Sequence, residues 1–487
     1  MEIESTSNPA HSESTGIDGS SYADSRNSRG RLESFESDLH KASMASCFMN
    51  LANTILGSGM LGLPYAYSHT GWVLGSFLLL ICGCSSAFAL HLLALCALEM
   101  KGPASFYTVA QATMPSFTVV IDVAVAIKCF GVATSYLIVI GDLMPQVMSQ
   151  FGAAQWAQDR HIWVFIGFCV VAPLCCLRNL DSLRFTSTAS LGFVVFLTLL
   201  VVLFASNVPS LDPCQSVADD DVCVGRTANA IVDMTTGKVI SIFIFGYTCQ
   251  QNIFSSVNEM KQPTPGRINA VVATSIFVAM SIYLIVAACG YHTYGASVDP
   301  DILVNYPETS FVSVARLAVS LLVAFSYPLQ CHPSRRSILT LLSTYLDKPA
   351  EDKWLVAAPT SSPLGNEELG SPTGDHSAEA EISQFNSVSV ASSAVAPSIE
   401  TQAMRYTVVT ACFLGLSLLI GLTVTNLGTV LALVGATGST TVSYILPGFF
   451  YFFLFENKGP AWKRYLALAQ GIIGLIIVPV CLTFIFL

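Results

Sequence analysis

Residues 50–65 read NLANTILGSGMLGLPY, so glycines and a proline interrupt an apolar segment that is long enough to cross a membrane. A spanning helix that breaks its own backbone hydrogen bonds must line a cavity, because each unpaired N–H or C=O group facing lipid costs several kcal/mol. Broken helices of this kind build the midplane sites of secondary transporters. A glycine-rich helix that packs closely through small residues gives the same local pattern, so this stretch alone leaves both interpretations open.

The composition of the whole chain is that of a membrane protein. Of the 487 residues, 53% are hydrophobic and only 11% are charged, against about a quarter charged in soluble domains. The mean hydropathy is +0.60. We therefore expect an all-α polytopic membrane protein that is surrounded by the lipid bilayer and has no nucleic-acid partner.

The apolar stretches predict about eleven transmembrane helices, each long enough for a hydrocarbon layer of about 30 Å. They lie near residues 44–66, 71–98, 117–149, 161–177, 185–206, 238–257, 268–292, 311–342, 404–425, 428–455 and 464–486. A cytosolic N-terminus places most of the 22 Lys and Arg residues in cytoplasmic segments. The positive-inside rule therefore favours this orientation.

Two polar segments lie outside the apolar stretches, and both are predicted to be disordered and cytosolic. They are the acidic, Ser-rich tail 1–43 and the Ser-, Pro- and acid-rich insertion 347–403. Each is either a solvated linker or a docking segment for regulatory partners. The remaining ranges, 44–346 and 404–487, are predicted to form a single transmembrane domain.

An external loop near residues 207–237 holds Cys214 and Cys223, whereas every other cysteine lies within an apolar stretch. This pair alone is placed where an oxidising environment lets a bridge persist, so we expect a disulfide between them. No histidine accompanies them in the loop, and a metal site is not expected.

A second interruption lies five spans after the first. Residues 243–254 read FIFGYTCQQNIF, which is polar and glycine-broken in the middle of an apolar run. Interrupted helices at matching positions in two halves indicate an inverted-repeat transporter. Spans one to five are therefore predicted to be mirrored by spans six to ten, with helices one and six broken.

Five runs of the chain, in order, resemble motifs of the amino acid/auxin permease family. These are residues 50–66, 131–145 (GVATSYLIVIGDLMP), 245–259 (FGYTCQQNIFSSVNE), 326–336 (SYPLQCHPSRR) and 435–447 (GATGSTTVSYILP). That family contains the sodium-coupled neutral amino-acid transporters of animals and the vacuolar amino-acid transporters of fungi and plants. The resemblance covers about residues 44 to 486 and implies the leucine-transporter type of fold and secondary active transport of amino acids by alternating access.

The resemblance also implies where the amino acid binds. Free N–H groups at the first break suit an α-carboxylate, while carbonyls at the second break suit an α-ammonium. Residues on spans three, six and eight are expected to contact the substrate side chain, although each aromatic among the candidates has simple helix packing as its alternative. The candidates are Gly57, Ser58 and Gly59, then Ser135 and Tyr136, then Phe245, Tyr247 and Thr248.

Two sets of residues are candidates for binding the coupling ion, one for Na⁺ and one for H⁺. Asn53 and Ser326 match positions that bracket a cation in the sodium-coupled relatives, and their neutral oxygens suit Na⁺. Many relatives carry histidine where this chain has Gln250, so that proton route is absent. Ionisable residues inside spans are functional candidates by default, and Lys128, Asp122 and His91 are the ones expected for H⁺ coupling.

Other classes of function fit the residues less well. An amino-acid-sensing receptor with little or no transport would use the same fold, and a flux measurement separates the two. Signature motifs of intramembrane enzymes are missing from the sequence, so an enzyme with a cofactor or a structural metal is not expected. The chain is expected in the plasma membrane or in a vacuolar or lysosomal membrane.

Overall fold

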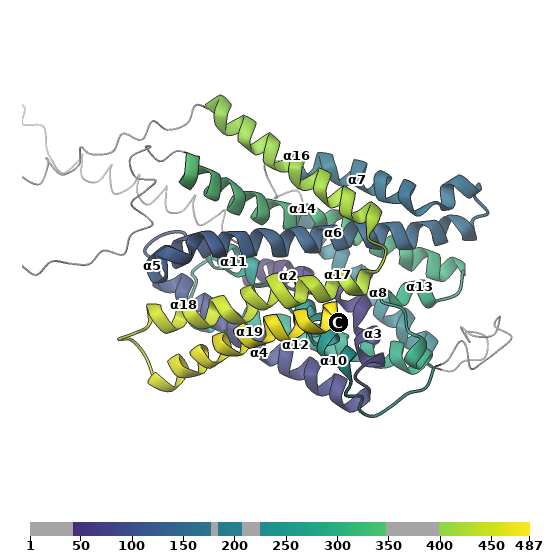
Figure 1. Cartoon of the computed structure of the whole chain (residues 1–487), viewed down its shortest axis with the longest axis horizontal. Coiled ribbons are helices and arrows are strands. Elements are labelled where there is room, and N and C mark those ends of the chain that lie inside the picture. Colours follow the sequence, from purple (N-terminus) through teal and green to yellow (C-terminus); the bar gives the residue numbers. More distant parts are fainter. Residues whose placement is uncertain (1–41, 177–183, 207–224, 347–398) are drawn as a thin grey trace, which may run out of the picture.

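The computed structural model of the chain describes residues 42–176, 184–206, 225–346 and 399–487 (Figure 1). Within these ranges the chain is helical and contains no strand. Its elements are α2 (Met44–Ile55), η1 (Ser58–Gly62), α3 (Leu63–Ser68), α4 (Trp72–Glu99), α5 (Phe106–Thr113), η2 (Pro115–Phe117), α6 (Thr118–Gln150), η3 (Gln155–Gln158), α7 (Arg160–Cys176), α8 (Arg184–Ala205), α10 (Met234–Gly246), η6 (Gln250–Asn252), α11 (Ile253–Glu259), α12 (Pro265–Tyr294), η7 (Gly295–Ser297), α13 (Ile302–Asn305), α14 (Ser310–Leu346), α16 (Ile399–Thr423), α17 (Leu427–Val434), η10 (Gly435–Ser439), η11 (Thr441–Ile445), α18 (Leu446–Leu454) and α19 (Ala461–Phe486).

Within the described ranges, seven helices are long and apolar enough to cross a membrane, by length and composition. They are Trp72–Glu99, Pro115–Gln150, Pro265–Ser297, Ser310–Thr344, Glu400–Thr423, Leu427–Leu454 and Ala461–Phe486. The predicted all-helical polytopic membrane protein is confirmed at this level. The count of eleven spans and the five-plus-five repeat stay predictions, and the predicted disulfide lies outside the described residues.

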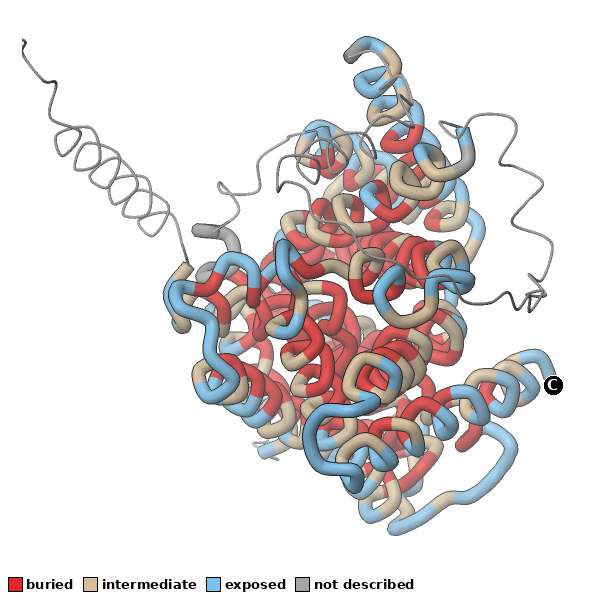
Figure 2. Tube along the Cα trace, turned by 90° about the vertical axis from the view of Figure 1, so that its left-hand side faces the viewer, coloured by how far each residue is buried: buried red, intermediate tan, exposed pale blue. Residues whose placement is uncertain are grey.

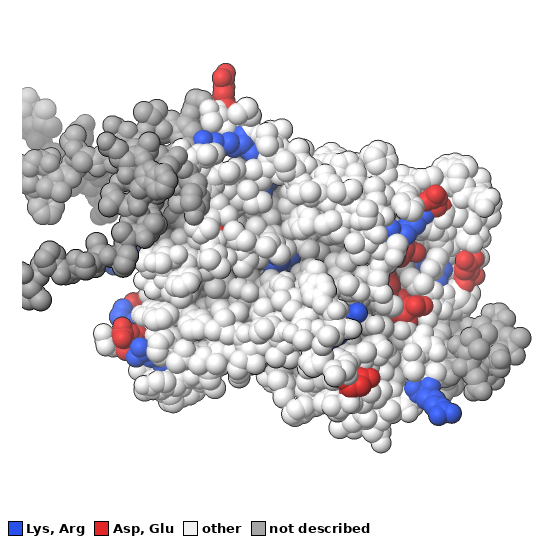
Figure 3. All heavy atoms as spheres, viewed as in Figure 1, with Lys and Arg blue, Asp and Glu red and all other residues white. Residues whose placement is uncertain are grey.

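The surface of the helix bundle matches a lipid environment. Buried residues fill the middle of the bundle and exposed ones lie around it (Figure 2), yet many exposed side chains are large and apolar. On α19, for example, Ile473 and Ile476 are 50% and 58% exposed. In the described part, charged atoms gather mostly toward the two ends of the bundle, and the broad band between them is largely uncharged (Figure 3).

One end of the bundle, which we name the Ala42 end, is closed by backbone pairing. The Ala42 N–H donates to the Glu259 carbonyl at 2.7 Å, and the Lys261 N–H donates to the Ala42 carbonyl at 2.9 Å. Beside them, the Asn258 amide accepts from the Ala104 N–H at 3.0 Å and donates to the Ala104 carbonyl at 2.8 Å. The start of α2 and the end of α11 are therefore tied together.

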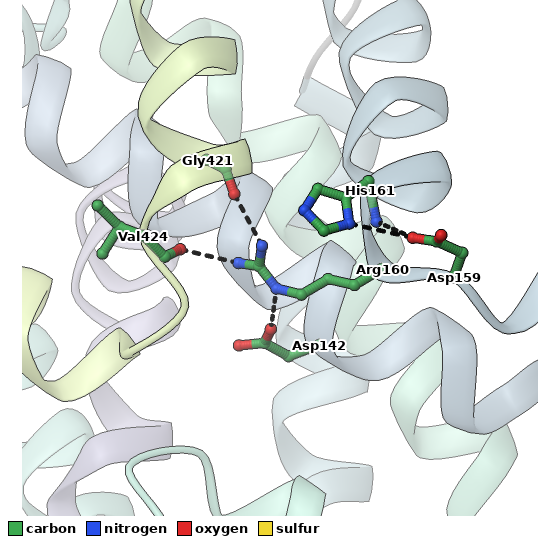
Figure 4. Close-up of polar contacts among 6 residues, drawn as sticks. All are labelled: Asp142, Asp159, Arg160, His161, Gly421 and Val424. Atoms are coloured by element: carbon green, nitrogen blue, oxygen red, sulfur yellow. Dashed lines mark hydrogen bonds and ion pairs between the residues drawn. The ribbon is translucent and has the colours of Figure 1, made fainter.

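The opposite end, named the Arg160 end, is held by one guanidinium group (Figure 4). Arg160 begins α7 and donates to Asp142 of α6 at 2.8 Å. It also donates to the carbonyls of Gly421 and Val424 at 3.0 and 2.9 Å. The last carbonyls of a helix have no partner within the helix and favour a cation, so Arg160 joins α6 and α7 to the end of α16.

A second buried arginine holds the other end of α7. Arg335 of α14 donates to the Cys175 carbonyl at 2.9 Å and to the Thr410 hydroxyl of α16 at 3.0 Å. Its guanidinium lies 4.0 Å from the centre of the Tyr406 ring. Helix α7 is therefore held near both ends, and α16 is held at its C-terminus by Arg160 and near its middle by Arg335.

The loop between α12 and α14 covers the Arg160 end. Its Asp301 is buried, accepts from the Leu303 N–H at 3.0 Å, and has one oxygen without a hydrogen-bond partner among the described residues. Removal from water raises the pKa of Asp301 to about 7, and the nearby Asp142 carboxylate adds to this rise. Pro300 packs against Gly62 of η1 and Gly428 of α17, so the loop lies on two helices of the core.

The Arg160 clamp predicts a stability difference between two charged pairs. Arg160→Gln leaves Asp142 and two helix-end carbonyls without their donor, which costs on the order of 2–4 kcal/mol for a largely buried pair. Lys458→Gln is the control, because Lys458 is 60% exposed in its pair with Glu99 and exposed pairs contribute about 0–1 kcal/mol. The melting temperature of the purified protein should fall clearly for Arg160→Gln and little for Lys458→Gln. Equal losses would contradict the clamp.

Asp301 predicts a pH dependence of stability. Its pKa rises from the ordinary 3.8 to about 7 in the folded protein, so the folded state binds this proton more tightly and its stabilising contribution is lost as pH rises from about 4 to 7. Asp301→Asn keeps an oxygen for the Leu303 N–H and removes the titration. The melting temperature of the wild type should therefore fall from about pH 5 to pH 8 more steeply than that of Asp301→Asn. Parallel curves would contradict this assignment.

Candidate functional site

The first helix is interrupted at Leu56 and Gly57. Helix α2 ends at Ile55, and the chain restarts as a 3-10 helix at Ser58 whose N-terminus has no side-chain cap. The first N–H groups of a helix have no partner within the helix. The break therefore presents donors inside the protein, although the glycine stretch forms a 3-10 turn rather than an extended segment.

The second interruption follows α10, which ends at Gly246 before η6 and α11. The two breaks touch each other. A Cβ atom placed on Gly59 would lie 3.0 Å from the Gly246 Cα and 3.2 Å from the Phe245 ring. Because one of these atoms is backbone and cannot turn aside, a side chain at position 59 requires the second break to shift by a few tenths of an ångström. The structure thus brings together the predicted residues Gly59 and Phe245.

Tyr283 of the unbroken helix α12 bonds to both breaks. Its hydroxyl lies 2.6 Å from the Ile55 carbonyl and 2.8 Å from the Gly246 carbonyl. These carbonyls end α2 and α10, so one proton donor serves two helix C-termini. The side chain is fully buried. Nothing in the apolar run of α12 distinguishes this tyrosine from a packing residue, which is why the sequence did not predict it.

Two further predicted pairs meet at the first break. The Ser135 hydroxyl of α6 donates to the Val132 carbonyl at 2.8 Å, so the Ser58 hydroxyl, 3.1 Å away, must donate to Ser135. A Cβ atom on Gly57 would lie 3.3 Å from the Tyr136 hydroxyl. Ser58, Ser135, Gly57 and Tyr136 therefore form one buried group.

Tyr247 and Thr248 lie differently from Phe245. The Tyr247 carbonyl accepts from the Ser86 hydroxyl of α4 at 2.9 Å, and its ring centre lies 5.2 Å from that of Tyr283. Tyr247 is the first residue after α10, which ends at Gly246, so its side-chain direction is not set by the helix. Thr248, which follows α10, donates its hydroxyl back to the Ile244 carbonyl of that helix at 2.8 Å.

Gln250 joins three elements. Its side-chain nitrogen donates to Ser86 of α4 at 2.8 Å, and its oxygen accepts from Ser443 of η11 at 2.8 Å and from the Cys249 N–H at 3.0 Å. The residue is fully buried. It therefore acts as a neutral hydrogen-bonding bridge between α4, the second break and η11.

Two features of the site were not predicted from the sequence. Gln251 is buried, and neither its amide oxygen nor its nitrogen has a hydrogen-bond partner among the described residues. The stretch from Gly435 to Ile445 contains two π-helical turns, η10 and η11. Turns of this type are frequent at functional sites. The run GATGSTT, small and polar within an apolar segment, was the available signal.

The ion-binding candidates Asn53 and Ser326 are both buried. The Ser326 hydroxyl has no hydrogen-bond partner among the described residues, so no direct hydrogen bond joins it to Asn53. One turn further along α14, the Gln330 side chain lies on the same face. Its oxygen is 3.5 Å from the Lys128 ammonium nitrogen of α6.

The three candidates for proton coupling occupy separate places. Lys128 is buried in the middle of α6, and Asp122 lies near the start of that helix, beside Ser337 of α14. His91 of α4 is bonded at both ring nitrogens, to Asn269 at 2.7 Å and to Lys463 at 3.0 Å. Lysine only donates, so the His91 Nε2 accepts, Nδ1 carries the proton, and the ring is neutral.

No group of three or more His, Cys, Asp or Glu side chains in the described ranges has the arrangement of a metal site. The polar atoms at the breaks are neutral amides, hydroxyls and backbone groups. Groups of this kind are suited to hydrogen bonds with a small polar molecule.

Comparison with known proteins identifies relatives over the whole transmembrane region. Residues 40–487 match the family model described as transmembrane amino acid transporter protein. The chain is 32% identical to vacuolar amino acid transporter 5 of Schizosaccharomyces pombe, over 93% of this chain and 96% of the relative. It is 33% identical to vacuolar amino acid transporter 6 of Saccharomyces cerevisiae, over 91% of this chain and 98% of the relative.

A more distant similarity extends to animals. The chain is 26% identical to the human sodium-coupled neutral amino acid transporter 7, over 62% of this chain and 65% of the relative. These relatives are transporters, which confirms the resemblance seen in the sequence motifs and the prediction that the protein is not an enzyme.

The two hydrogen bonds of Tyr283 predict that removing its hydroxyl destabilises the protein more than removing another buried tyrosine hydroxyl. Tyr283→Phe leaves two helix-end carbonyls without their shared donor, at a cost of about 1–3 kcal/mol, and frees the breaks to separate. Tyr306→Phe is the control, because the buried Tyr306 hydroxyl has no partner among the described residues. The melting temperature should fall for Tyr283→Phe and stay level or rise for Tyr306→Phe. A Tyr283→Phe protein as stable as the wild type would show that the breaks do not depend on this bond.

Proposed function

The chain belongs to the transmembrane amino acid transporter protein family, and from this premise we propose that it is a secondary active transporter of neutral amino acids that works by alternating access. The observation that carries the proposal is the contact between the two helix breaks, where Gly59 meets Gly246 and Tyr283 bonds to both sides. The relatives are named as transporters, which does not favour a receptor without flux.

The polarity of the breaks suits the two charged groups of an amino acid. The N-terminus of η1 at Ser58 is uncapped and offers N–H groups to an α-carboxylate. The C-terminus of α10 at Gly246 carries the negative end of a helix dipole, which suits an α-ammonium. The unpaired amide of Gln251 adds a donor and an acceptor at the second break.

The pocket for the substrate side chain is proposed on α6 and α10. Tyr136 and Phe245 lie at the first break, and Ser135 is bonded to Ser58. These groups are aromatic or carry a hydroxyl, and none is charged. A neutral substrate side chain is therefore the best match.

The coupling ion is Na⁺ or H⁺. Asn53 and Ser326 offer buried neutral oxygens of the kind that bind Na⁺, and the unpaired Ser326 hydroxyl is free to do so. Lys128 is the titratable group near this face of α14, because its ammonium nitrogen lies 3.5 Å from the side-chain oxygen of Gln330. No other cofactor is proposed.

The chain path and the basic residues support a proposal for the membrane topology. We propose eleven crossings with a cytosolic N-terminus, in which the broken paths α2–η1–α3 and α10–η6–α11 each count as one crossing. Spans one to five and six to ten would form the inverted repeat. The similarity to vacuolar transporters supports a vacuolar membrane, with the Arg160 end facing the lumen.

The proposed function predicts that adding one methyl group at position 59 causes a loss of transport. In proteoliposomes, Gly59→Ala places a Cβ atom 3.0 Å from the Gly246 backbone, which separates the breaks. We expect uptake of radiolabelled neutral amino acids to fall at least tenfold. Gly415→Ala on α16 is the control, because nothing lies within 4 Å of the added carbon. Wild-type protein that binds amino acids and moves none of them would establish a receptor instead, and normal uptake by Gly59→Ala would place the site elsewhere.

A further inference from the structure

Lys128 is the least compensated charged side chain in the described core. It is 1% exposed, and its one described hydrogen bond is to Gln330 at 3.5 Å, the long limit of such bonds. No described carboxylate forms an ion pair with it. An ammonium has three donors, and buried charges are normally paired. Packing alone does not account for a lysine at this position.

Irregular backbone surrounds this side chain. A Cβ atom on Gly438 of η10 would lie 2.5 Å from the Lys128 Cβ, so the π-helical turn packs directly on α6 at this residue. Cys249, between α10 and η6, is close enough to interact electrostatically with the lysine. Lys128 therefore lies where α6, α14, the second break and the π-helical segment meet.

The titratable groups around Lys128 are few. The neighbouring thiols are Cys129 on α6 and Cys249 at the second break, with Cys331 of α14 beside Cys129. Segment η10 has the sequence GATGS and contributes none. Asp122 lies six residues earlier on α6 and interacts with Ser337. A change of charge on Lys128 is therefore not cancelled by a neighbouring carboxylate.

Gln330 connects Lys128 to the first break. Its side chain also hydrogen-bonds the Tyr136 hydroxyl, which lies against Gly57. An ammonium only donates, so it fixes the Gln330 oxygen toward Lys128. A neutral amine has a lone pair, so it also accepts a hydrogen bond from the NH₂ group of Gln330. When the Gln330 amide turns, its oxygen and its NH₂ group exchange places. The Tyr136 hydroxyl then faces the other of these two groups.

We propose that Lys128 binds and releases the proton that is coupled to amino-acid movement, and that Gln330 and Tyr136 transmit its charge to the first helix break. The inference rests on the proposed transport function. In each cycle one proton from water on one side converts the amine to an ammonium, and that proton leaves to water on the other side. No further reactant is consumed.

The test uses the full chain in proteoliposomes. Accumulation of radiolabelled neutral amino acids is measured under a pH gradient of either sign without Na⁺, and under a Na⁺ gradient at equal pH. Exchange of labelled for unlabelled amino acid, which needs no gradient, is measured in parallel. For the wild type we expect accumulation under a pH gradient and proton movement reported by a trapped pH dye.

Lys128→Met should lower the ratio of gradient-driven accumulation to exchange at least tenfold and abolish the dye response. Lys238→Met, at the first turn of α10, is the matched lysine control and should leave this ratio unchanged. If Lys128→Met does not fold, Gln330→Glu replaces it, because a carboxylate beside the ammonium holds the proton and should lower the same ratio.

Three results would overturn the inference while leaving the transport function in place. They are accumulation driven by Na⁺ alone, an unchanged ratio in Lys128→Met, and an unchanged ratio in Gln330→Glu. A wild type that neither exchanges nor accumulates any amino acid would instead overturn the transport function itself.

Discussion

The hydrogen bonds from Tyr283 to the Ile55 and Gly246 carbonyls are the constraint on which the interrupted helices depend. A helix that breaks inside a membrane must find new partners for its freed backbone groups within the protein. Here a single hydroxyl on an unbroken helix supplies that partner for two helices. Because the two carbonyls share one hydroxyl donor, the ends of α2 and α10 cannot move apart without one carbonyl losing its hydrogen bond. The two breaks therefore behave as one unit.

A different part of the bundle is held together by two arginines. Arg160 attaches α7 and α16 to α6, and Arg335 attaches them to α14. Each guanidinium bonds to carbonyls at a helix C-terminus, so each clamp also completes the hydrogen bonding of a helix end. The bundle thus divides into a clamped group, α6, α7, α14 and α16, and a group that contains both breaks. Ser58, Ser135, Gly57 and Tyr136 lie where these two groups meet.

The sequence predicted the features that depend on local chemistry. Apolar composition indicated a membrane protein, and the interruptions at Gly57 and Gly246 were visible as glycines within apolar runs. The sequence did not predict Tyr283, because a tyrosine in an apolar helix has no pattern that shows what its hydroxyl contacts. The candidates Tyr247 and Phe245 stay predictions; the contact of Phe245 with position 59 is a tertiary contact that no local pattern encodes. The unpaired amide of Gln251 depends on tertiary packing, which no local pattern encodes.

The two ends of the bundle are held together by different chemistry. At the Ala42 end the contacts are backbone pairs at Ala42 and amide bonds at Asn258, which do not change charge. At the Arg160 end the covering loop contains a buried carboxyl, Asp301, whose pKa lies near 7. Pro300, its neighbour, contacts both η1 and α17. An ionised carboxylate favours water, so burial at this place favours the neutral form of Asp301. The contacts named at the Ala42 end contain no such group.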